Sequence, residues 1–129
     1  MLKALLIDDE IASTRSLEIL LSQFCKQVDV VGTARSVEEG LLKVSKLAPD
    51  LVFLDIEMPG GTGFDFLEKC QELNFEVVFI TAYDNYAIKA FKYSAIDFIL
   101  KPIEIDELIK AKNQAFPSFR RKPESRDFN

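Results

Sequence analysis

The chain has 129 residues, enough for one domain that folds unaided, and it carries a formal net charge of -5 with no histidine. The acidic balance argues against general nucleic-acid binding, because no excess of basic side chains is present to displace counterions from phosphates. The lack of histidine excludes a Ser-His or Cys-His nucleophile, a histidine-ligated zinc site and a phosphohistidine carrier.

Membrane and secreted classes are also disfavoured. No apolar run approaches the roughly 18 residues of a membrane span. The opening run at residues 2–7 is too short for a secretory signal and halts at two acids, so we expect a cytoplasmic protein. Cys25 and Cys70 are predicted to be buried thiols on inner helix faces rather than a disulfide or a zinc site.

Strands and helices alternate through the first part of the chain. The apolar run at 2–7 predicts a strand that ends at Asp8 and Asp9, and the run at 28–33 predicts a second strand. A helix opened by a capping box at Ser36 follows. The helix between the two strands is predicted to bury Leu17, Leu20, Leu21 and Phe24.

The centre of the chain is a predicted strand over residues 50–55, whose four apolar residues run straight into Asp55. A turn rich in glycine ends it, and Thr62 with Asp65 caps a third helix. That helix is predicted to bury Phe66, Leu67, Cys70 and Leu73. Open α/β sheets place ligand sites at the carboxyl ends of their strands, so Asp55 is the leading candidate site residue.

Two further strands complete the pattern, over residues 76–82 and 95–102, the second closed by Pro102. The helix predicted over 84–93 lies between them, and a last helix runs from 104 to about 115. The helix over 84–93 is predicted to turn three residues inward: Ala87, Ala90 and Phe91.

Five strands alternating with five helices predict a parallel sheet with right-handed crossovers. The second and fifth strands carry Asp29 and Asp97, which puts them at the edges and gives the strand order 2-1-3-4-5 of a flavodoxin-like α/β fold. We expect residues 1–116 to form the domain. Residues 117–129 have two prolines and no period, so we expect a flexible tail or linker stub.

The predicted strand order brings Asp8, Asp9 and Asp55 to one crevice, at the switch point between the first and third strands. Crowded carboxylates repel one another unless a cation lies among them. Hard oxygen ligands favour Mg²⁺ over zinc or copper, so a magnesium site is predicted here.

Thr81 and Lys101 end the fourth and fifth strands, so a hydroxyl and an ammonium reach the same crevice and can bind a phosphoryl group. Asp55 is then the nucleophile that forms an aspartyl phosphate, and the small Ala82 leaves room for the phosphate. Taken one at a time, these residues have simpler explanations. Asp8 and Asp9 could cap a helix, Lys101 could be a solvated surface lysine, and Thr81 could be an ordinary strand threonine. Their convergence favours the phosphoryl site.

In these motifs the chain resembles the response regulator receiver domains of two-component signalling, over roughly residues 2–115. The matching motifs are Asp8-Asp9, Asp55 with Met58-Pro59 and Gly63, Thr81-Ala82, and Lys101-Pro102. The resemblance implies that Asp55 accepts a phosphoryl group from a sensor histidine kinase. It also implies a phosphoacceptor domain rather than an enzyme.

The resemblance also assigns the metal ligands. Asp9, Asp55 and the backbone carbonyl of Glu57 would bind Mg²⁺ directly, and Asp8 would act through water. By the same resemblance, the group that the kinase phosphorylates is the Asp55 carboxylate, which lies beside that ion.

Phosphate contacts and a switch are implied in the same way. Lys101 and Thr81 would contact the phosphate, the peptide bond to Pro102 would be cis, and Thr81 with Phe98 would form the switch. The signal would change the face made by the fourth helix, fifth strand and fifth helix, through which the protein could form a homodimer. We expect the exposed part of that face to carry Tyr86, Lys89, Tyr93, Asp97 and Glu107.

The stretches around Thr81 and Lys101 are similar to a narrower group, the receivers that precede a LytTR-type DNA-binding domain. No such domain falls within the 129 residues. We expect a fragment of a longer regulator rather than a stand-alone receiver, with DNA contacted only through an output domain.

Three alternatives remain beside this interpretation. An aspartate-nucleophile phosphatase of the haloacid dehalogenase kind would carry Asp-x-Asp after its first strand, whereas Asp8 and Asp9 are adjacent. A Rossmann domain would carry Gly-x-Gly-x-x-Gly there. A receiver-like interaction module that never needs phosphate is disfavoured by the intact set of site residues, without being excluded.

Overall fold

The computed structural model describes residues 1–127, and side chains within residues 1–117. One parallel sheet of five strands forms the centre, in the order β2-β1-β3-β6-β7. Its strands are β1 (Leu2–Ile7), β2 (Val28–Ala34), β3 (Leu51–Leu54), β6 (Glu76–Thr81) and β7 (Asp97–Leu100). In chain order this is 2-1-3-4-5, so the predicted flavodoxin-like α/β fold is confirmed.

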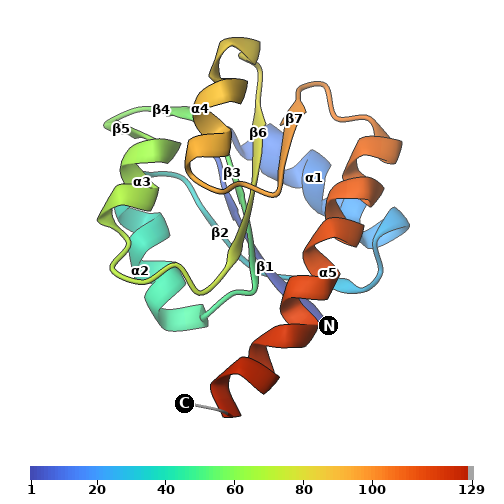
Figure 1. Cartoon of the computed structure of the whole chain (residues 1–129). Coiled ribbons are helices and arrows are strands. Elements are labelled where there is room, and N and C mark those ends of the chain that lie inside the picture. Colours follow the sequence, from blue (N-terminus) through green and yellow to red (C-terminus); the bar gives the residue numbers. More distant parts are fainter. Residues whose placement is uncertain (128–129) are drawn as a thin grey trace.

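Helices cover both faces of the sheet (Figure 1). They are α1 (Ile11–Phe24), α2 (Val37–Leu47), α3 (Gly63–Lys69), α4 (Ala87–Lys92), which follows the 3-10 turn η1 (Asp84–Tyr86), and α5 (Ile105–Asp127). α1 and α5 lie on one face, and α2 and α3 lie on the other. No helix within residues 1–127 is long and apolar enough to cross a membrane.

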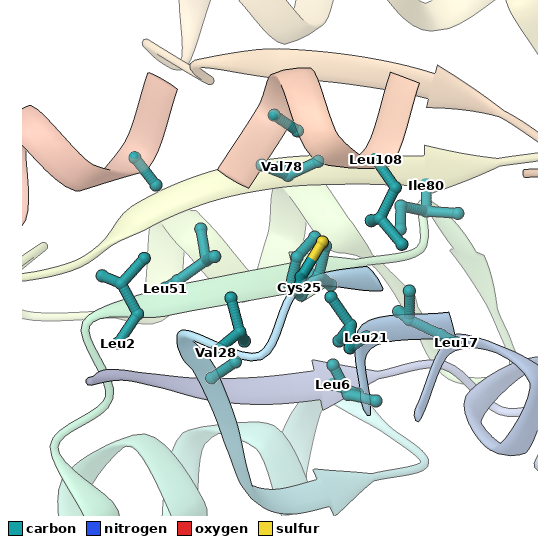
Figure 2. Close-up of a cluster of buried hydrophobic side chains, with 14 of the residues drawn as sticks. Leu2, Leu6, Leu17, Leu21, Cys25, Val28, Leu51, Val78, Ile80 and Leu108 are labelled. Carbon is teal, nitrogen blue, oxygen red and sulfur yellow. The ribbon is translucent and has the colours of Figure 1, made fainter. Parts of the chain in front are cut away.

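Each face of the sheet has its own apolar core, because the strands are buried on both sides. Figure 2 shows the core under α1 and α5, where Leu17, Leu21 and Leu108 pack against Leu6 and Ile80 of the strands. The other core is rich in phenylalanine and includes Leu54, Phe64, Phe66, Phe75 and Phe79. The two cores make the sheet a stiff support for whatever lies at its carboxyl edge.

A short antiparallel hairpin, β4 (Glu57–Met58) with β5 (Gly61–Thr62), follows the central strand β3. Gly60 makes the turn with a φ of 83°, a conformation that favours glycine. Thr62 then begins α3, and its side chain and that of Asp65 each accept a hydrogen bond from the other residue's backbone N–H. The predicted cap of this helix is confirmed.

The ring of Phe64 on α3 contacts α4 and the residues at its two ends. Its centroid lies 5.9 Å from that of Tyr86 and 5.0 Å from that of Tyr93. The Nζ atom of Lys89 lies 4.6 Å from the same centroid, in a cation–π contact. The predicted exposure of Tyr86 and Tyr93 is therefore wrong in part: both are half-buried against Phe64.

Phe91 is 69% exposed, so the prediction that it faces inward is wrong. The core-facing residue of α4 is Ala90, and the half-buried Tyr86 and Tyr93 lie four residues before it and three after it, on the same side of the helix. Phe91 lies about 100° further round the helix than Ala90 and faces solvent. Leu73 and Phe24 are also exposed, because Leu73 lies beyond the end of α3 and Phe24 is the last residue of α1.

The last helix is longer than predicted, since α5 continues to Asp127 and extends past the sheet (Figure 1). Pro117 does not end it and lies at an exposed position. A proline removes one backbone donor from a helix, and this one has solvent rather than a packed neighbour beside it. The division into a domain over residues 1–116 and a tail over 117–129 stays a prediction.

Gly63 permits a close approach of two backbone segments, which suggests a test. A Cβ atom at this position would lie 2.5 Å from the backbone oxygen of Asp55. We expect Gly63→Ala to lower the free energy of unfolding by roughly 2–3 kcal/mol in a urea titration, because backbone must move.

Gly60→Ala is the matched control for this loss. A Cβ at Gly60 meets nothing within 4 Å, so only the positive φ is penalised, at about 1 kcal/mol. A loss at Gly63 equal to or smaller than that at Gly60 would contradict the steric explanation.

Candidate functional site

The carboxyl ends of the strands carry the predicted site residues, and three of them, Asp8, Asp55 and Lys101, lie one position beyond a strand. Their backbone N–H groups still donate to the neighbouring strand: Asp8 to the oxygen of Ala34 at 3.0 Å, Asp55 to that of Ile7 at 2.9 Å, and Lys101 to that of Thr81 at 2.8 Å. The hydrogen-bond ladder therefore holds the backbone of all three residues. Their side chains are aimed by the sheet rather than by a free loop.

Asp8, Asp9 and Asp55 meet as predicted, with one carboxylate oxygen of each within 4.8 Å of the others. Asp8 and Asp55 are 7% and 6% exposed, and Asp9 is half-buried. Oxygen ligands at this spacing suit a hard divalent cation such as Mg²⁺.

The side chain of Lys101 reaches into this group of acids. Its Nζ atom lies 2.8 Å from Oδ2 of Asp8 and 3.3 Å from Oδ2 of Asp55. Burial by itself lowers the pKa of Lys101, but the hydrogen bond to Asp8 and the charges of Asp55 and Asp8 outweigh it and raise the pKa above its ordinary value. Lys101 is therefore an ammonium in this site.

Burial raises the pKa of the Asp55 carboxyl above its ordinary value. The charge of Lys101 acts in the opposite direction, and the charge of Asp8 adds to the increase. The other carboxylate oxygen, Oδ1, accepts a hydrogen bond of 2.7 Å from the N–H of Ile56. Asp55 is thus oriented by the backbone N–H of Ile56 on one side and by Lys101 on the other.

The remaining predicted residues surround this centre less closely. Thr81 ends β6 and is completely buried, and its hydroxyl oxygen lies 3.4 Å from the N–H of Tyr83, which donates to it. Ala82 follows it at an exposed position. Phe98 is half-buried on β7, with its ring centroid 6.5 Å from that of Phe79. The peptide bond between Lys101 and Pro102 is cis, as the resemblance implied.

Sequence reasoning missed two neighbours of Lys101. The Oγ atom of Ser13 lies 3.2 Å from its Nζ atom, and Oε1 of Glu10 lies 3.6 Å from it. Their signal in the sequence is weak: both fall at the start of α1, within four residues of the Asp8-Asp9 pair. A serine there is otherwise unremarkable in a helix.

A second missed contact joins the hairpin to the turn before α4. The hydroxyl of Tyr86 donates a hydrogen bond of 2.8 Å to Oε2 of Glu57. This bond, with the charge of Glu57, raises the pKa of the Tyr86 hydroxyl. Glu57 was predicted only for its backbone carbonyl, and its side chain is exposed toward this tyrosine.

A cavity of about 360 Å³ opens beside these residues. Asp8, Asp55 and Lys101 line its polar part, and apolar side chains that include Leu17, Leu20 and Ile103 line the rest. The space lies between α1 and the segment that follows β7. A small charged group at the acids would have room beside the lysine.

Comparison with known proteins agrees with this geometry. Residues 4–113 match the family model described as the response regulator receiver domain. The chain is 47% identical over 111 residues to an uncharacterized response regulatory protein of Vibrio cholerae, covering 85% of this chain and 46% of that protein. It is 38% identical over 112 residues to the sensory transduction protein LytT of Bacillus anthracis, covering 85% of this chain and 45% of LytT.

The chain therefore spans about half the length of the curated relatives it matches. Among solved structures, the response regulatory domain of protein mrkE from Klebsiella pneumoniae superposes with a TM-score of 0.83 at 26% identity, covering 93% of this chain and 99% of that one. Fold, acid cluster and sequence agree, and the chain belongs to the response regulator receiver family of two-component signalling.

Proposed function

We propose that Asp55 accepts a phosphoryl group from a phosphohistidine of a sensor histidine kinase, in a reaction that depends on Mg²⁺. The observation that carries the proposal is the position of the Lys101 ammonium, 3.3 Å from the Asp55 carboxylate and within a group of three acids. An ammonium beside a nucleophilic carboxylate offsets the charge that a phosphoryl group brings.

In this proposal Asp9, Asp55 and the backbone carbonyl of Glu57 bind the metal directly, and Asp8 binds it through water. The oxygen-only set and the mutual distances of the three carboxylates fit Mg²⁺. When bound, such an ion would neutralise charge on the phosphoryl oxygens and reduce the repulsion among the acids.

The transfer itself is a displacement at phosphorus. A carboxylate oxygen of Asp55 forms a bond to phosphorus, and the bond from phosphorus to the imidazole nitrogen of the kinase breaks. The imidazole leaves with the electron pair of that bond. Lys101 stabilises the negative phosphoryl oxygens, and the Thr81 hydroxyl, whose oxygen already accepts from Tyr83, can donate its proton to one of them.

We propose that phosphorylation changes the surface formed by α4, β7 and α5, and that this surface transmits the signal. Ile88 and Phe91 are 77% and 69% exposed on α4, and Leu100 is 40% exposed on β7. Apolar side chains so exposed suit a contact with a second copy of the chain. Leu100 pairs with Thr81 across the sheet, so a shift of Thr81 toward a phosphate acts directly beside this surface. Phe98, on the same strand, is the proposed switch side chain.

Control of transcription is assigned to an output domain outside residues 1–129. The chain covers 46% of the Vibrio cholerae relative and 45% of LytT, and its net charge of -5 does not suit contact with the phosphates of DNA. The competing function, an interaction module that needs no phosphate, predicts an output that Asp55→Asn leaves unchanged.

The first test is the identity of the acceptor. Incubation with acetyl phosphate and Mg²⁺ should add one phosphoryl group by mass spectrometry, labile to hydroxylamine, because an acyl phosphate forms. Asp55→Asn should abolish the addition, because an amide is a poor nucleophile. Label that persists in this variant, or that maps to Asp8 or Asp9, would contradict the assignment.

The second test concerns the metal. A tenfold excess of Mg²⁺ over its dissociation constant should raise Tm by roughly 3–6 °C, because binding favours the folded state. Asp9→Ala should lose most of this rise. Asp29→Ala, an exposed acid paired with Lys3 at the other end of the sheet, should keep it. An equal response in both variants would argue against this site.

The third test concerns the output face. Beryllofluoride with Mg²⁺ should strengthen a homodimer measured by sedimentation at several concentrations. Phe91→Ser should weaken this dimer roughly tenfold, because a buried aromatic is lost at the contact. Phe98→Ala should leave phosphorylation intact and remove the strengthening.

Leu42→Ser on α2 is the control for the third test, since Leu42 is 73% exposed outside the proposed output face. A dimer as sensitive to Leu42→Ser as to Phe91→Ser, or a mass distribution that beryllofluoride does not change, would place the output elsewhere.

A further inference from the structure

The ammonium of Lys101 has three N–H donors and three close acceptors. They are Oδ2 of Asp8 at 2.8 Å, Oγ of Ser13 at 3.2 Å and Oδ2 of Asp55 at 3.3 Å. A lysine ammonium can donate three hydrogen bonds, so this set uses its whole capacity. Two of the acceptors are charged, and Ser13 is the neutral one.

The hydroxyl of Ser13 is used differently from other hydroxyls of α1. Thr14 and Ser22 donate to the backbone oxygens of Ile11 and Ile19, three residues earlier in the same helix. Ser13 instead accepts from a side chain that is 88 residues away in the sequence. It is half-buried in the first turn of the helix, so the contact is partly shielded from water.

We propose that Ser13 is a positioning residue for phosphoryl transfer, which holds the Lys101 ammonium beside Asp55. The inference rests on the proposed function and adds a residue to its machinery. One N–H of the ammonium donates to Asp8 in the shortest of the three contacts, and a second donates to Ser13. With these two directions fixed, the third N–H points at Asp55.

A neutral acceptor suits this position better than an acid. A third buried carboxylate would hold the ammonium more strongly and would repel an incoming phosphoryl group. Glu10 is the nearby acid, but its side chain is 65% exposed at 3.6 Å, so water screens its charge. A hydroxyl orients Lys101 and leaves its charge available to the phosphoryl oxygens.

The cavity explains why the Lys101 side chain needs the hydrogen bond to Ser13 to keep its orientation. Ser13 and Lys101 both line the space of about 360 Å³, so the lysine side chain has room to move if the bond to Ser13 is lost. The same space can accept the extra methyl group of threonine. Ser13→Thr therefore keeps the hydroxyl, and Ser13→Ala removes it.

The experiment measures the rate at which acetyl phosphate phosphorylates the full chain with Mg²⁺. In this reaction a bond forms between an Asp55 oxygen and phosphorus, and acetate leaves with the electron pair of the broken phosphorus–oxygen bond. We expect Ser13→Ala to lower the maximal rate constant roughly 2- to 10-fold, the kinetic effect of one hydrogen bond. The Mg²⁺ concentration for half-maximal rate should stay within about twofold, and Ser13→Thr should restore the rate.

Two controls separate positioning from a general effect on structure. Ser16→Ala removes a hydroxyl one turn along α1 at an exposed position and should react like the unaltered protein. In a Lys101→Met background, Ser13→Ala should have no further effect, because the group that it orients is gone.

The outcomes distinguish this inference from the function on which it rests. If the unaltered chain is not phosphorylated at Asp55, both fail. If it is phosphorylated, an unchanged rate in Ser13→Ala overturns the inference alone. So does an equal loss of rate in Ser16→Ala or in Ser13→Thr, and so does a further loss of rate when Ser13→Ala is added to Lys101→Met.

Discussion

The ion pairs of Lys101 are the interaction on which the site depends. Asp8 and Asp55 are like charges that are almost buried at adjacent strand ends, an arrangement that costs free energy through lost hydration and mutual repulsion. Lys101 offsets part of that cost from the end of β7, with contacts of 2.8 and 3.3 Å. The contact that permits two buried acids also brings a positive charge to the place where a phosphoryl group would arrive.

The site and the proposed output surface differ in how firmly they are held. Asp8, Asp55 and Lys101 each keep a backbone hydrogen bond to a neighbouring strand, and the sheet behind them has an apolar core on each face. The helix α4 has six residues and buries one of them, Ala90. Elements with few buried side chains open at low free-energy cost. A rigid site beside a loosely held helix suits the proposed coupling of phosphorylation to a change of this surface.

Tyr86 and Phe64 connect these two regions through contacts separate from those of the proposed switch residues Thr81 and Phe98. Tyr86 donates to Glu57, two residues after Asp55, and its ring packs against Phe64. Lys89 and Tyr93 of the same segment also contact Phe64. The position of α4 therefore depends on the hairpin and on α3 as well as on the sheet. This packing is also why the apolar residues left on its surface are Ile88 and Phe91.

The sequence by itself determined the strands, their order and the acids, because apolar runs mark buried strands and topology rules place their carboxyl ends together. It therefore located Asp8, Asp9, Asp55 and Lys101 in one crevice. The tertiary structure decided the rest. The outward position of Phe91 follows from the packing of Tyr86 and Tyr93 against Phe64, which the apolar period does not reveal, and the bond from Lys101 to Ser13 depends on how α1 packs beside the end of β7. Such contacts join residues far apart in the chain, and their geometry is set by packing between elements rather than by any local pattern.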